Sequence, residues 1–162
     1  MLQFCMTAQE FLAEQIERIG DSLAHYIETT ALDRLNWQPQ LPGSAPTRSA
    51  LEQAAECIAV NRAFASLLRG DTVVPSLADE PTPTTPAEAR ARLQASCSNL
   101  ATVIRASPDS LLDTVFQTHR GQRTGKGLMI GAYRNMAYHC GQINLLQILA
   151  GDGEFHIPTT WL

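Results

Sequence analysis

Three segments of this sequence share one helix-start pattern, in which a hydroxyl residue comes three positions before a glutamate. They are Thr7-Ala-Gln-Glu10, Ser49-Ala-Leu-Glu52 and Thr85-Pro-Ala-Glu88. In a capping box the hydroxyl accepts a hydrogen bond from the third helical amide, and the glutamate carboxylate accepts one from the amide of the capping residue. Each start is followed by apolar residues at helical spacing. The repetition of this pattern favours a mainly helical fold.

The apolar residues recur at alternating strides of three and four, which is typical of helices packed at shallow angles in a bundle. We therefore predict an all-α, up-and-down-like four-helix bundle that forms one domain over residues 1–162. The predicted helices run over Thr7–Thr30, Ser49–Arg69, Thr85–Ala106 and from about Gly127 to Ala150, with Gly70 and Gly151 after the second and the last.

The connections are long, and two of them contain three prolines each, at 31–48 and 70–84. Proline interrupts helices, so we expect loops there, with Trp37 closing one end of the core. In the third connection, Thr114–Thr118 predicts a short strand and residues 119–126 a glycine-rich turn. Loops of this length in a compact helical domain are usually functional or laid against the core.

Composition excludes several classes of protein. The 162 residues carry a net charge of −4, and basic residues are not interleaved with aromatic ones, so we expect no nucleic-acid partner. We find no stretch of eighteen apolar residues and no secretory signal, so we expect a cytoplasmic protein without a membrane partner. The cysteines (Cys5, Cys57, Cys97 and Cys140) are widely spaced and include no CxxC pair. This favours free, buried thiols over a zinc ribbon or a redox dithiol.

His139 is the most informative single residue, because it falls within the buried stripe of the last predicted helix. Burying an imidazole without a partner costs about 1–3 kcal/mol, so another polar group should face it. Glu56 is the best candidate, since it lies at the edge of the apolar line of the second predicted helix and itself needs a partner.

Tyr138-His-Cys-Gly-Gln-Ile143 resembles the His-x-Gly-Gln-Ile signature of the DinB-like (DNA-damage-inducible) four-helix bundles. Leu35-Asn-Trp-Gln-Pro39 resembles the Trp-x-Pro loop of that family, and the order of elements is similar over nearly the whole chain. Relatives include the mycothiol-dependent maleylpyruvate isomerases and the bacillithiol transferases, in which three histidines bind a divalent metal at one end of the bundle.

The resemblance implies a degenerate metal site. His139 matches the last ligand of the family, while Asn135 and Glu56 stand where the other two histidines would be. Glutamate is a competent ligand for zinc or nickel, but a neutral amide is a poor one for such metals. A divalent ion would therefore be weakly held by Glu56, Asn135 and His139, or absent. In the second case Glu56 and His139 form a buried pair, with Asn135 as a further hydrogen-bonding group.

Arg120, Arg123 and Lys126 lie in the glycine-rich segment before the last helix. Cations beside a helix N-terminus can bind a phosphate or a carboxylate, and in the family this region borders the pocket mouth. A solvated basic loop is the alternative. The segment lacks the Gly-Lys-Ser/Thr ending of a phosphate-binding loop, so nucleotide hydrolysis is not expected.

Two hypotheses about function follow. We prefer a non-catalytic bundle that binds a small ligand or pairs with itself as a homodimer. The alternative is a small-molecule transferase or isomerase that uses a divalent metal and a low-molecular-weight thiol.

Overall fold

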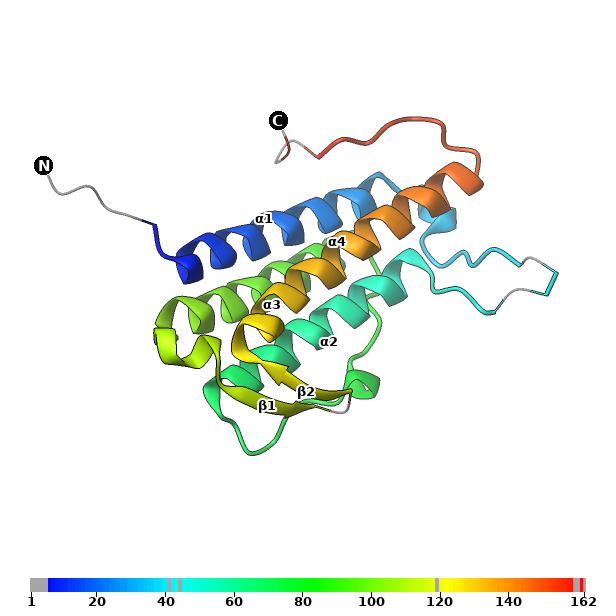
Figure 1. The fold of residues 1–162 in the computed structure, drawn as a ribbon. Coiled ribbons are helices and arrows are strands. Elements are labelled where there is room, and N and C mark those ends of the chain that lie inside the picture. The colour runs from blue at the N-terminus through cyan, green and yellow to red at the C-terminus, as the bar shows by residue number, and fades with distance from the viewer. Residues whose placement is uncertain (1–5, 41, 44, 119, 159–160, 162) are drawn as a thin grey trace, which may run out of the picture.

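The computed structural model describes residues 6–40, 42–43, 45–118, 120–158 and 161. Within them the chain forms α-helices joined by short 3₁₀ helices and one hairpin (Figure 1). The α-helices are α1 (Ala8–Thr29), α2 (Ala50–Arg69), α3 (Pro86–Ala106) and α4 (Gly125–Leu149). The 3₁₀ helices are η1 (Leu32–Arg34), η2 (Leu77–Asp79) and η3 (Asp109–Leu112), and the strands are β1 (Val115–Thr118) and β2 (Gly121–Thr124). The predicted all-α four-helix bundle is confirmed.

The predicted helix starts are confirmed, although only one of them is a complete capping box. Ser49 accepts a hydrogen bond from the Glu52 amide, and the Glu52 carboxylate accepts one from the Ser49 amide at 2.7 Å. At the other two starts only the threonine hydroxyl caps the helix. The predicted ends hold as well, because Gly70 and Gly151 follow α2 and α4 with φ of 79° and 94°, a left-handed conformation that suits glycine.

The direction of the helices differs from the up-and-down expectation. Residue pairs between helices show that α1 and α3 are antiparallel, since Glu10 and Glu28 pair with Arg105 and Arg90 respectively. In contrast, α2 and α3 are parallel, with Asn61 bonded to Ser96 and Arg69 to Asn99. Around the bundle the order is α1, α3, α2, α4, so that α1 lies diagonally opposite α2 (Figure 1).

The reason is the proline-containing connection between α2 and α3. It is long enough to run back along the length of the bundle, so α3 begins at the same end as α2. A chain of this length in extended form spans more than the roughly 30 Å of a 20-residue helix.

All four helices contribute to one core. Its largest fully buried side chains come from each helix: Ile16, Leu23 and Ile27; Leu51 and Ile58; Leu93, Leu100 and Ile104; Leu128, Met129, Met136 and Ile143. α1 and α3 pack tightly at Gly20, where an added Cβ would lie 2.5 Å from Cys97 Sγ. No helix among the described residues is long and apolar enough to cross a bilayer.

The segment predicted as a turn at 119–126 contains a second strand. β1 and β2 pair antiparallel from Val115 with Thr124 to Thr118 with Gly121. The strand β2 was missed because its residues, Gly-Gln-Arg-Thr, are polar and largely exposed, which leaves no apolar alternation to detect. The helix α4 also begins two residues earlier than predicted, because Thr124 caps it by accepting a hydrogen bond from the Gly127 amide.

Trp37 is not part of the main core. It lies half-buried under the Arg34 guanidinium, 5.8 Å from the ring centroid, and lines a separate cavity of about 250 Å³. Its loop contributes Leu35 to the core instead.

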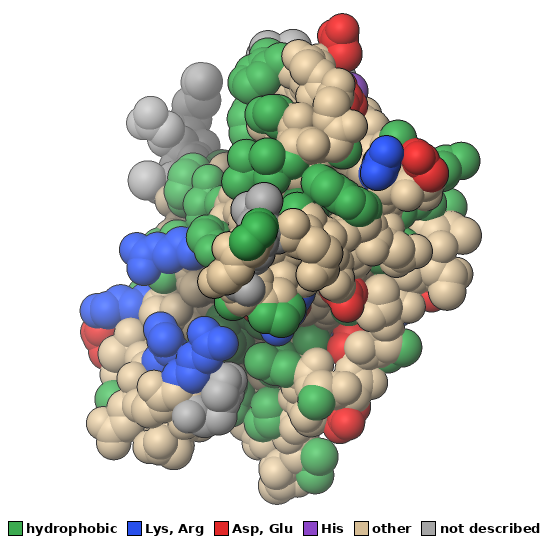
Figure 2. All heavy atoms as spheres, turned by 90° about the vertical axis from the view of Figure 1, so that its right-hand side faces the viewer, with side chains coloured by type: hydrophobic (Ala, Val, Ile, Leu, Met, Phe, Trp, Pro, Cys, Tyr) green, Lys and Arg blue, Asp and Glu red, His purple; other side chains and the backbone are tan. Residues whose placement is uncertain are grey.

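The C-terminal tail folds back on α1, where Trp161 Nε1 donates a hydrogen bond to Ser22 Oγ at 3.0 Å. Figure 2 views the end of the bundle where α4 ends and α2 begins, with basic side chains gathered along one edge.

Candidate functional site

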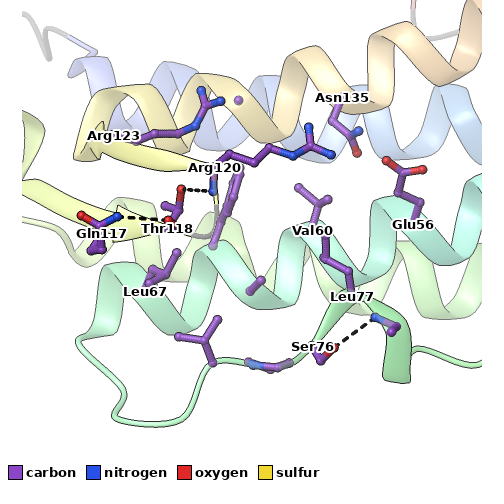
Figure 3. A pocket seen from close by; sticks show the side chains of 16 residues that line it. Glu56, Val60, Leu67, Ser76, Leu77, Gln117, Thr118, Arg120, Arg123 and Asn135 are labelled. Carbon is purple, nitrogen blue, oxygen red and sulfur yellow. Dashed lines mark hydrogen bonds between the residues drawn. The ribbon is translucent and has the colours of Figure 1, made fainter.

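A pocket of about 600 Å³ lies between α2 and α4 and is bordered by the hairpin and by residues 74–78 (Figure 3). Its volume is in the range of small-molecule sites. The apolar part of its wall comes from α2 and from the connection to α3, namely Val60, Ala63, Phe64, Leu67, Val74, Pro75, Leu77 and Ala78. The polar part comes from Glu56, Asn135 and the hairpin residues.

Close approach of α4 to α2 depends on Gly131, which also lines the pocket. A Cβ at this position would lie 3.2 Å from Cε2 of Phe64, so the absence of a side chain leaves room for the aromatic ring. Phe64 and Leu67 lie one turn apart on α2. The structure places them at the pocket wall as half-buried side chains packed against the core.

The structure brings together the three residues predicted as metal ligands or as a buried polar pair. Glu56 extends from α2 and Asn135 from α4, and the two face each other across the polar end of the pocket (Figure 3). One turn further along α4, His139 points inward and is 4% exposed. Its Nε2 lies 3.6 Å from Glu56 Oε2.

Gln53 fixes the protonation of the His139 ring. The Gln53 Nε2 group donates to the Arg48 carbonyl at 3.1 Å, which turns the amide oxygen toward Nδ1 of His139 at 3.0 Å. Because an amide oxygen only accepts, Nδ1 carries the proton and donates. In the neutral ring, Nε2 is then the atom with the lone pair, and it is the atom that faces Glu56.

Burial keeps this imidazole neutral. It lowers the pKa of His139 to about 4, with a smaller lowering from the positive charge of Arg48, while a hydrogen bond with the Gln142 side chain acts in the opposite direction. The Glu56 carboxylate forms its ion pair with Arg48, which lies just before α2. The predicted pairing of Glu56 with His139 is therefore a contact between a carboxylate and a neutral ring at neutral pH.

Oδ1 of Asn135, at this end of the pocket, is buried without a hydrogen-bond donor among the described residues, whereas Oε2 of Glu56 lies against Arg48, its ion-pair partner. Buried acceptors are normally satisfied, and leaving one unsatisfied costs about 1–3 kcal/mol. The arrangement thus has room for a cation or for a molecule that donates hydrogen bonds.

The hairpin brings two of the three predicted anion-binding cations to the pocket. Arg120 and Arg123 line it, and neither guanidinium forms an ion pair or hydrogen bond with a described residue. The Arg120 amide donates to Thr118 Oγ1 at 3.2 Å, and its side chain extends along the pocket toward Asn135 (Figure 3). Lys126 is not part of the pocket wall, because its ammonium pairs with Asp113 at 2.5 Å.

The described cysteines offer no reactive thiol. Cys57, Cys97 and Cys140 are free and buried, and burial raises the pKa of Cys97 and of Cys140 to about 12 and that of Cys57 well above its ordinary value. The expectation of free, buried thiols is confirmed for these three. Cys5 lies outside the described residues.

A four-helix bundle with a polar cluster between its second and fourth helices, at one end of an apolar pocket, defines the class of this protein. A sequence model of the DinB superfamily matches residues 15–143, so the chain belongs to that superfamily. Its structure is similar to the crystal structure of a conserved protein from Enterococcus faecalis, with a TM-score of 0.71, 13% identity, and coverage of 91% of this chain and 99% of that one. A search of curated proteins gives no match.

Proposed function

We propose that this protein binds a small amphipathic anion in the pocket between α2 and α4. The observation that carries the proposal is the pair of guanidinium groups, Arg120 and Arg123, which line a pocket with apolar walls and have no carboxylate partner among the described residues. Sites for small molecules combine such apolar walls with a few polar groups that fix orientation.

Most other cations of the chain have a carboxylate partner, whereas these two arginines have none among the described residues. Nine of the twelve lysines and arginines have a carboxylate within 4.0 Å: Arg18, Arg34, Arg48, Arg62, Arg69, Arg90, Arg92, Arg105 and Lys126. Of the remaining three, Arg120 and Arg123 line the pocket, and only Arg134 lies elsewhere. Guanidinium binds carboxylates and phosphates through paired hydrogen bonds, so an anionic ligand would complete this surface.

The test uses 8-anilinonaphthalene-1-sulfonate, an apolar anion whose fluorescence rises on binding. We expect one site per chain, with binding about 3–10-fold weaker in Arg120→Gln and in Arg123→Gln, because exposed charges are partly screened. Leu67→Trp, which fills the apolar wall, should weaken binding about 10-fold. Arg134→Gln is the matched control, since it removes an unpaired arginine outside the pocket. Equal binding by all four variants would contradict the proposal.

A second candidate function is a divalent metal site, and it rests on Glu56, which lies 3.6 Å from His139 Nε2 and faces Asn135 across the pocket. The donor set fits such an ion in kind: one imidazole nitrogen, one carboxylate oxygen and one amide oxygen. The hydrogen bond from His139 Nδ1 to Gln53 is the outer contact that metal-binding histidines usually make. Against tight binding, Arg48 already pairs with Glu56.

A bound divalent ion would act as a Lewis acid that lowers the pKa of a bound thiol or water, as the thiol-dependent transferase hypothesis requires. The chain itself would orient His139 through Gln53 and place Arg48 against the Glu56 carboxylate. Elemental analysis of untagged protein and titration with Ni²⁺ or Zn²⁺ test this candidate. Binding should be lost in Glu56→Gln and in His139→Gln and kept in His25→Gln. Substoichiometric metal with no binding on titration would exclude it.

A further inference from the structure

The polar end of the pocket places hydrogen-bond acceptors beside an arginine, and this combination restricts the ligand further than its charge alone. We infer that the ligand head group carries a carboxylate with a hydrogen-bond donor on the neighbouring carbon, as in an α-amino or α-hydroxy acid with a large apolar body. The inference rests on the proposed function, because it assigns a ligand class to the same pocket.

The donor is required by Asn135. Its Oδ1 is buried without a donor among the described residues, whereas the neighbouring Glu56 carboxylate pairs with Arg48. A ligand whose head is only a carboxylate would bring further acceptor oxygens toward Asn135 Oδ1. An ammonium or hydroxyl group supplies the missing hydrogen atoms instead.

The carboxylate is required by Arg120. In Figure 3 the Arg120 side chain reaches from the hairpin past Val60 toward Asn135, so its guanidinium lies on the side of the pocket where the acceptors are. If a carboxylate binds the Arg120 guanidinium and a donor faces Asn135, adjacent atoms of one ligand can carry both groups. Arg123 lines the same pocket and adds positive charge on the hairpin side.

The apolar body follows from the remaining wall. Beyond the polar end, the pocket wall includes Phe64, Leu67 and Leu77. In this part of the wall, neither α2 nor residues 74–78 contribute a charged side chain. The pocket volume of about 600 Å³ exceeds what the head group fills. A bulky apolar side chain on the α-carbon would occupy this part.

Four small probes that share one phenyl body separate the contributions of the head group. L-phenylalanine and L-3-phenyllactate carry both the carboxylate and a donor, 3-phenylpropionate lacks the donor, and 2-phenylethylamine lacks the carboxylate. Calorimetric titration of the full chain at pH 7.5 with EDTA should show at least one of the first two binding 10-fold or more tightly than both of the others. The amino and hydroxy acids differ in charge, so their ratio reports which donor the site prefers.

Two variants assign the contributions to residues. Asn135→Leu removes an acceptor and should abolish the advantage of the donor-bearing acids. Its affinity for 3-phenylpropionate should stay within about 2-fold of the wild-type value. Asn135→Ser serves the same purpose if the leucine variant does not melt cooperatively. Arg120→Gln should weaken all three acids about equally and leave 2-phenylethylamine unchanged. Arg134→Gln is again the control.

The outcomes distinguish this inference from the proposed function. Equal affinity for 3-phenylpropionate and the donor-bearing acids overturns the inference but leaves anion binding intact. Binding of the naphthalene sulfonate without binding of any phenyl probe also overturns it. If the donor-bearing acids bind more tightly only when Ni²⁺ or Zn²⁺ replaces EDTA, the acceptor atoms bind a metal. That result overturns the inference that they accept hydrogen bonds from the ligand. Failure of all probes, the sulfonate included, refutes the proposed function itself.

Discussion

Acidification below pH 7 should destabilise this protein through His139. Burial lowers the pKa of His139 from 6.5 to about 4, so the unfolded chain takes up a proton at higher pH than the folded one. For a base with a depressed pKa in the folded state, stability is complete above the unfolded pKa and is lost as pH falls toward the folded value. Between pH 8 and pH 5, these two pKa values correspond to a loss of about 2 kcal/mol in the free energy of unfolding.

The measurement is urea unfolding at several pH values between 8 and 5, in the wild type and in His139→Gln. The variant lacks the titrating group, so its stability should fall by about 2 kcal/mol less over this interval than that of the wild type. His25→Gln is the matched control, because it removes a half-buried histidine of α1 that is remote from the pocket. Parallel pH profiles for the wild type and His139→Gln would refute the reasoning that burial holds the ring neutral.

Two further predictions concern glycines that the fold uses differently. Gly20→Ala should destabilise the protein by about 1–3 kcal/mol, because the new methyl group meets Cys97 Sγ in the α1–α3 contact. Gly141→Ala should stabilise it by up to about 1 kcal/mol through helix propensity, since a Cβ there has no atom within 4 Å. Gly125→Ala should destabilise by about 2 kcal/mol or more and weaken binding of the naphthalene sulfonate, because its methyl group collides with the Leu111 carbonyl where the hairpin joins α4. Thermal melting measures the first pair, and melting combined with fluorescence titration measures the last.

The helices could be predicted from the sequence because their signals are local. A hydroxyl residue at the cap, a stripe of apolar residues and a terminal glycine all act within a few residues of the feature that they specify. The direction of α3 could not be predicted in this way. It depends on the path of the connection at 70–85, and the prolines there exclude a helix without specifying where the loop leads.

The polar cluster was predictable in part for a different reason. Ionisable residues on buried helix faces need partners, and this requirement points to Glu56 and His139 on two neighbouring helices. Gln53 was missed, although it lies one turn before Glu56 on the same face of α2, because a glutamine there is equally typical of a solvated position. The pocket itself depends on the spacing of α2 and α4 and on the packing of residues 74–78, which no local pattern encodes.

The diagonal position of α1 and α2 has a consequence for synthesis of the chain on the ribosome. The lateral neighbours of α1 are α3 and α4, which are translated last, so the first two helices cannot close into a stable hairpin of their own. The apolar face of α1, with Ile16, Leu23 and Ile27, stays uncovered until residues up to 106 have left the exit tunnel. We therefore expect the nascent N-terminal half to be bound by chaperones that recognise exposed apolar segments.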